Sequence, residues 1–145
     1  MAAGNAQGRG LAVLRMALGV FFIFEALGKS GWLLDPSPLG KQLTGWQETA
    51  GPMNRWYLET VALPGAAVFA RLVLLGEAAA GVALVLGVYS RLAALLAFLM
   101  VLNFHVASGA IFRYQFLTNG YGLPVLAGLL AIVIGGAALP FSVKK

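Results

Sequence analysis

The chain has 145 residues, of which 60% are hydrophobic and only 10% are charged, and its formal net charge is +5. A soluble domain is roughly half apolar and about a quarter charged, so this composition predicts an integral membrane protein with small parts outside the bilayer. The basic residues are spread singly, which argues against nucleic-acid binding. The absence of cysteine excludes disulfides, thiol redox chemistry and iron–sulfur ligation.

The first apolar stretch, residues 11–28, is just long enough to cross a hydrocarbon core, which needs roughly 20 residues. Arg15 and Glu25 interrupt the stretch, and a clear cleavage site of small residues is missing. We therefore expect an uncleaved membrane helix rather than a signal peptide. Lys29 and Trp32 follow, where the ammonium can extend to the interface and the indole can lie in it.

Residues 33–63 are polar and rich in proline, so they cannot form one continuous helix. Ser37 followed by Pro38 fits the N-cap and first residue of a helix. Two short apolar stripes follow, one of Leu39, Leu43 and Trp46, and one of Met53, Trp56, Tyr57 and Val61. Two interpretations stay open and can coexist: two short helices lying flat on the membrane surface, or an ordered loop that caps the bundle.

Three more apolar segments, residues 65–88, 92–112 and 123–139, complete the prediction. We expect an all-α fold, a four-transmembrane-helix bundle in a single membrane domain of residues 1–145. Small residues four positions apart favour close helix packing, and they occur at Gly76 and Ala80 and at Ala127, Ala131 and Gly135. Four spans place both termini on one side. The basic residues favour the cytoplasmic side of the inner membrane for the termini only when Arg15 is counted.

Charges inside the apolar segments need partners or a task. Depths estimated from a rise of about 1.5 Å per residue pair Glu25 with Arg71 and Arg15 with Glu77, and they put His105 level with the first pair. One interpretation is structural: two ion pairs that set the helix register, with His105 hydrogen-bonded to Asn103 or to a backbone carbonyl.

The other interpretation is a ligand-binding pocket of Glu25, Arg71, His105 and Asn103 beneath the tryptophan-bearing surface segments, with Arg15 and Glu77 as a structural pair. An acid, a base and an imidazole suit an oxyanion or a quinone carbonyl that exchanges protons. A single histidine is poor evidence for a metal site. We expect no firmly bound cofactor, and quinone as the candidate ligand.

Several motifs resemble the DoxX/DoxD-like membrane proteins. The first helix carries Arg15-x3-Gly19-x8-Gly28-Lys29, and the second carries Arg71-x4-Gly76-Glu77. Ser90-Arg91-Leu92-Ala93-Ala94 and Met100-x2-Asn103-Phe104 follow. The resemblance implies a small four-helix membrane protein, with Arg15, Lys29, Arg71, Glu77, Arg91 and Asn103 at the family's polar positions.

The resemblance also implies functions. The best-known relatives are membrane subunits of thiosulfate:quinone oxidoreductase, which pair with a second subunit, and others act beside redox or detoxifying enzymes or in assembly. We therefore expect a subunit of a quinone-linked oxidoreductase among other membrane subunits. The alternative is a non-catalytic structural or assembly subunit of a larger respiratory or photosynthetic complex. A transporter ranks last because the helices show no convincing internal duplication.

Overall fold

The computed structural model describes residues 2–143, and within this part of the chain the regular structure is helical. The long apolar helices are α1 (Ala2–Gly28), α4 (Ala66–Leu86) and α5 (Ser90–Ala107), followed by the shorter α7 (Leu123–Gly135). Between them lie the short elements η1 (Ser30–Leu33), α2 (Ser37–Thr49), α3 (Pro52–Tyr57), η2 (Leu58–Ala62) and α6 (Tyr114–Thr118).

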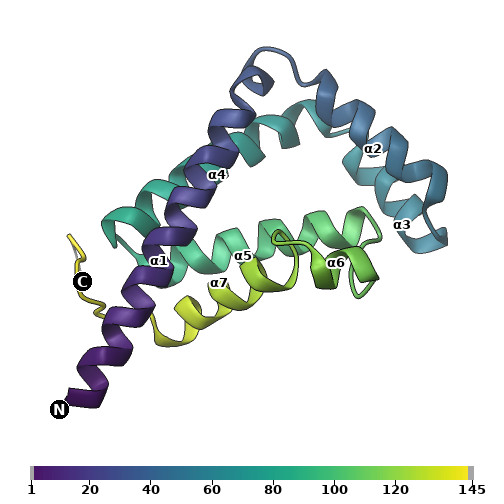
Figure 1. The fold of residues 1–145 in the computed structure, drawn as a ribbon. Coiled ribbons are helices and arrows are strands. Elements are labelled where there is room, and N and C mark those ends of the chain that lie inside the picture. Colours follow the sequence, from purple (N-terminus) through teal and green to yellow (C-terminus); the bar gives the residue numbers. More distant parts are fainter. Residues whose placement is uncertain (1, 144–145) are drawn as a thin grey trace.

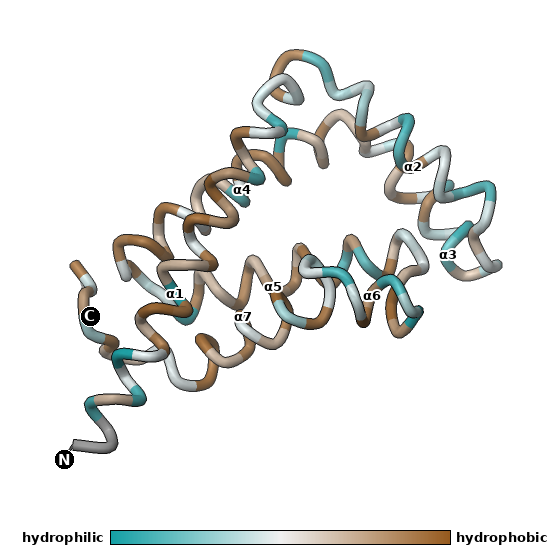
Figure 2. Tube along the Cα trace, viewed as in Figure 1, coloured by the Kyte–Doolittle hydropathy of each residue, from teal (hydrophilic) through white to brown (hydrophobic). Residues whose placement is uncertain are grey.

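The molecule has two ends of different character. The described N- and C-terminal residues lie at one end, and α2, α3 and α6 lie at the other (Figure 1). Polar positions gather toward the chain start and in the short helices, while α1, α4, α5 and α7 are mostly apolar (Figure 2). We call the end formed by residues 30–65 and 108–122 the outer end.

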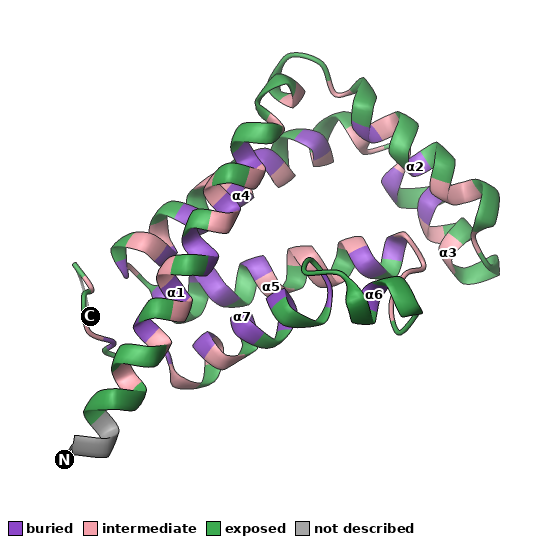
Figure 3. Ribbon diagram, viewed as in Figure 1, coloured by how far each residue is buried: buried purple, intermediate pink, exposed green. Residues whose placement is uncertain are grey.

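Within residues 2–143, three helices are long and apolar enough to cross a membrane: Asn5–Gly28, Ala66–Leu86 and Ser90–Ala107. Exposed residues recur along these helices (Figure 3), and large apolar side chains are among them, such as Phe24, Leu72 and Leu96. An apolar belt of this kind, turned away from the protein core, suits contact with lipid tails.

The pair α1 and α4 packs with its backbones in contact. A Cβ atom added at Gly19 would lie 2.7 Å from the backbone nitrogen of Val85 and 2.8 Å from the carbonyl oxygen of Gly81. A Cβ atom at Gly81 would lie 2.8 Å from the backbone nitrogen of Ile23. The two glycines therefore set the crossing point of an antiparallel pair, as small residues do between membrane helices.

Two helices end earlier than the sequence predicts. The third apolar segment was expected to run to residue 112, but α5 ends at Ala107 and Gly109 adopts a left-handed φ of 67°. The last helix was expected to run to residue 139, but α7 ends at Gly135 and Gly136 follows. Glycine loses the most entropy in a helix, so both glycines favour termination before the apolar sequence ends; Gly109 also adopts a positive φ, whereas φ of Gly136 is −80°.

The outer end has a small core of its own. Helix α2 begins at Ser37 with Pro36 at the N-cap, one residue before the N-cap that the sequence predicts, and the Ser37 N–H donates to the Asp35 carboxylate at 3.0 Å. This bond lowers the pKa of Asp35 below its ordinary value. The core consists of apolar residues from α2, η2, α4 and α5, namely Leu39, Leu43, Leu58, Ala62, Ala70 and Ala107.

Candidate functional site

A charged cluster joins the end of α1 to the middle of α4. The ammonium of Lys29 donates to Glu25 Oε2 at 2.7 Å and to Glu77 Oε1 and Oε2 at 3.1 and 3.0 Å. The three side chains are mostly buried, with 17%, 24% and 10% of the Lys29, Glu25 and Glu77 side chains exposed. Two carboxylates therefore share one ammonium, which leaves one negative charge or one proton in the cluster.

Tyr121 connects this cluster to the segment before α7. Its hydroxyl donates to Glu25 Oε1 at 2.7 Å. The hydrogen bond to Glu25 raises the pKa of Tyr121 above its ordinary value, so the phenol keeps its proton and remains a donor at neutral pH. Its ring packs edge-on against Phe21, with the ring centroids 5.3 Å apart.

The cluster forms one wall of a cavity of about 700 Å³ at the outer end. This volume lies within the roughly 300–1,000 Å³ of small-molecule sites. Aromatic side chains line much of the rest, among them Trp32 and Trp46, and polar side chains from α2 and from residues 113–119 also reach it. The cavity thus combines charged groups on one side with flat apolar rings on the others.

His105 and Asn103 also line this cavity. The buried imidazole contacts the Tyr121 carbonyl through Nε2 at 2.8 Å, and because a carbonyl only accepts, Nε2 carries the proton. Asn103 Oδ1 accepts from the Tyr57 hydroxyl at 2.9 Å. Three predicted ligand-binding residues, Glu25, His105 and Asn103, therefore come together, and His105 has the backbone-carbonyl partner of the structural interpretation.

Arg71 does not join them. Its guanidinium donates to the backbone carbonyls of Leu33 at 3.1 Å and Ala67 at 3.0 Å, and it lies outside the residues that line the cavity. The predicted pair of Glu25 with Arg71 is therefore wrong, and Lys29 takes the place of Arg71. The reason is side-chain direction: side chains lean toward the N-terminus of their own helix, which carries Arg71 of α4 outward and away from Glu25.

Arg15 does not pair with Glu77 either. The Arg15 guanidinium lies beside Gly87, ten residues or about 15 Å along the helix direction from Glu77, because the Gly19–Gly81 crossing already places Val85 against Gly19. The fully buried guanidinium donates instead to the Phe141 carbonyl at 2.9 Å and to Ser142 Oγ at 3.2 Å. Arg15 therefore fastens residues after α7 to α1, while Glu77 binds Lys29.

The sequence interpretation missed two members of the site. The first is Lys29, which the sequence predicts at the membrane interface and at one of the family's polar positions, although Glu25 and Lys29 are four residues apart and can pair on one helix face. The second is Tyr121. Nothing in its local sequence indicates a bond to a residue 96 positions earlier.

The site can hold a ligand that has both a flat ring and polar oxygens. Lys29 and Tyr121 are hydrogen-bond donors, and the two carboxyl groups can take up and release a proton beside a bound molecule.

Comparison with known proteins gives a family match. The sequence model of the DoxX family matches residues 10–112, which contain α4, α5 and the whole charged cluster but not Tyr121. The resemblance inferred from the motifs around Arg15, Glu77 and Asn103 is thereby confirmed. Searches of curated proteins and of solved structures gave no match.

Proposed function

Because the chain belongs to the DoxX family of membrane proteins, we propose that its outer cavity binds the head group of a quinone. In this proposal the chain is the membrane subunit of a quinone-linked oxidoreductase. The observation that carries the proposal is the Lys29–Glu25–Glu77 cluster, which lines one wall of an aromatic cavity. A quinone head is a flat ring with two carbonyl acceptors, which matches aromatic walls and a cationic donor.

Hydrogen bonding gives each group a role. The Lys29 ammonium or the Tyr121 hydroxyl donates to a quinone carbonyl, while Trp32 and Trp46 cover the ring. Reduction of one quinone to a quinol consumes two electrons and two protons. The electrons come from a partner subunit that carries its own redox centre. Glu25 and Glu77 hold a proton between them and pass it to one quinone oxygen, and water in the open cavity restores it and supplies the second proton to the other oxygen.

The topology follows from the same proposal. Helix α7 completes a fourth span beside α5, to which Arg91 Nε fastens it by a bond of 2.7 Å to the Val133 carbonyl. Thirteen residues give α7 a length of only about 20 Å, so the residues that flank it complete the crossing. Helices α2 and α3 lie at the outer surface of the inner membrane, and both termini lie in the cytoplasm.

Binding of a short-tailed benzoquinone to the purified protein in lipid nanodiscs tests the proposal. Quenching of tryptophan fluorescence reports occupancy, since Trp32 and Trp46 line the cavity. Glu77→Gln and Tyr121→Phe should each weaken binding about tenfold, because a hydrogen bond involving a charged group contributes roughly 1.5–3 kcal/mol. Arg71→Gln is the matched control, because Arg71 lies outside the cavity and its variant should bind as the wild type does.

Equal affinity in all variants, or no saturable quenching in folded protein, would refute a quinone site at this cluster. Thermal unfolding of each variant separates loss of binding from loss of fold.

A structural or assembly subunit is the second candidate. Large apolar side chains are exposed at the outer end, including Met53, Trp56, Phe112 and Tyr114. Such residues can hold another subunit as well as a membrane surface. Co-purification with a membrane complex, together with failure of the quinone-binding test, would support this function instead.

A further inference from the structure

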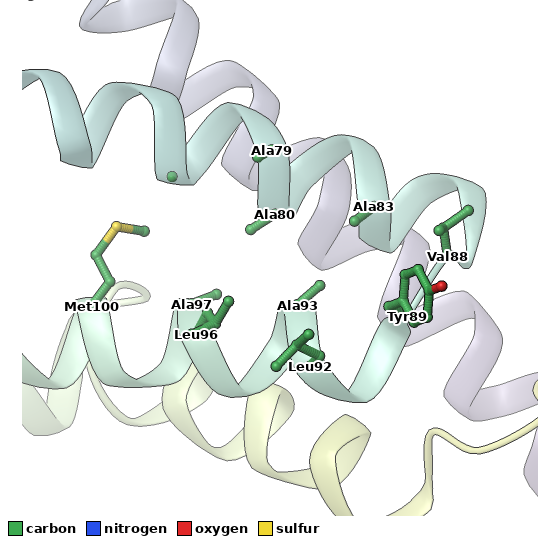
Figure 4. A pocket seen from close by; sticks show the side chains of 11 residues that line it. Ala79, Ala80, Ala83, Val88, Tyr89, Leu92, Ala93, Leu96, Ala97 and Met100 are labelled. Carbon is green, nitrogen blue, oxygen red and sulfur yellow. The ribbon is translucent and has the colours of Figure 1, made fainter.

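An apolar groove of about 270 Å³ runs between α4 and α5 (Figure 4). Small residues of α4, including Gly76, Ala79 and Ala83, form one wall, and Leu92 and Leu96 of α5 lie on the other. Met100 stands at one end, and Val88 and Tyr89 stand at the other. From Leu92 to Met100 the groove extends about 12 Å along α5.

The space suits a hydrocarbon chain. A dry apolar cavity of roughly 150 Å³ already holds a benzene molecule, and this groove is larger and longer. Its lining offers almost no polar atoms, so a charged or hydrogen-bonding head group gains nothing there.

Met100 joins the groove to the outer cavity, because its side chain lines both. A Cβ atom at Gly76 would lie 3.3 Å from the Met100 sulfur, so the thioether packs directly over Gly76. The next residue is Glu77, which binds Lys29. Methionine is unbranched and has three rotatable bonds, so a rotamer change at Met100 suffices to open one space into the other.

We infer that Met100 is the passage between a head-group cavity and a tail groove, and that the groove holds the isoprenoid tail of the quinone bound at the charged cluster. This inference rests on the function proposed above. A tail in the groove is surrounded by atoms about as apolar as the lipid that it leaves. Its binding free energy therefore comes from packing against α4 and α5 rather than from the hydrophobic effect.

Photolabelling tests the path of the tail. The full-length protein in nanodiscs is irradiated with a benzoquinone whose isoprenoid tail carries a diazirine, and labelled residues are mapped by mass spectrometry. We expect labels between residues 76 and 100, and we expect a tail-free benzoquinone in excess to remove them by taking the head-group cavity. Ala79→Phe, which fills the groove, should reduce this labelling about three- to tenfold, because the tail then loses its van der Waals packing against α4 and α5.

Two controls make the result specific. Ala17→Phe makes the same change at an exposed position of α1 away from the groove, and it should leave the labelling unchanged. A phosphatidylcholine with the diazirine in its acyl chain tests the other source of a tail. Strong labelling of the groove by this lipid, unaffected by the tail-free quinone, would overturn the inference.

The outcomes also separate the inference from the proposed function. If the tail-free quinone quenches tryptophan fluorescence but the tail labels no groove residue, the quinone site stands and the tail path is wrong. If neither quenching nor competed labelling occurs in folded protein, both are wrong.

Discussion

The Gly19–Gly81 crossing gives a test of the fold on which the site depends. Gly19→Ala adds one Cβ atom, which would lie 2.7 Å from the Val85 nitrogen, where ordinary van der Waals contact begins at 3.4 Å. The helices must therefore separate by about 0.7 Å, because the opposing atoms belong to the backbone and cannot rotate away. Overpacking of this kind costs about 1–3 kcal/mol of unfolding free energy.

Such a loss should lower the thermal midpoint by roughly 4–12 °C for a chain of this size. Intrinsic tryptophan fluorescence during heating in a mild detergent measures the midpoint. Gly10→Ala is the matched control, because Gly10 also lies within α1 and has open space around it. Alanine is the better helix former, so this variant should be unchanged or more stable by about 0.5–1 kcal/mol.

The two variants, on the same helix, are thus expected to change the thermal midpoint in opposite directions. If Gly19→Ala is as stable as Gly10→Ala, the α1 and α4 backbones are not in contact at this point. The same result would also contradict the α1–α4 register that keeps Arg15 away from Glu77.

Three further predictions concern the buried charges. Lys29→Met leaves two carboxylates facing each other and should cost about 3–5 kcal/mol of unfolding free energy, as loss of one partner from a buried pair does. Adding Glu77→Gln should restore part of the thermal midpoint. Equal midpoints for the single and double variants would contradict the shared ammonium. Arg15→Met should release the last described residues from α1. The measurement is amide exchange at Val143, whose N–H donates to the Leu86 carbonyl at 2.8 Å and should exchange faster in the variant. Unchanged exchange at Val143 would show that Arg15 does not hold these residues in place. Gly87→Ala should destabilise the fold more than Gly10→Ala in the same assay, because Gly87 has a φ of 73° and a Cβ there would collide with the Arg15 guanidinium.

The apolar segments and the need for charge pairing could be predicted from sequence because both follow from composition. Segment ends were less predictable: apolar residues continue past Ala107 and Gly135, but glycines at or just after these positions disfavour a longer helix. Glu25, Asn103 and His105 line one cavity, and their similar depth could be estimated because depth along a helix follows from residue number.

The partners of the charges could not be predicted by depth alone. In an antiparallel pair, side chains of α1 lean toward the inner end and side chains of α4 lean toward the outer end. Lys29 therefore reaches back to Glu25, and Glu77 reaches out to Lys29. Arg15 and Arg71 lean away from the acids once assigned to them. Adding this direction to the depth estimate would have favoured Lys29 as the shared cation.

The bonds between Arg15 and the residues after α7 also concern the order in which the chain is made. The partners of this guanidinium, Phe141 and Ser142, follow it by 126 and 127 residues. At about 5–20 residues per second, they emerge from the ribosome roughly 6–25 s later. During that interval α1 and α4 can meet at their glycines, but Arg15 lacks its final acceptors. Residues after α7 therefore complete the contacts of α1 only after the three intervening apolar helices have been made.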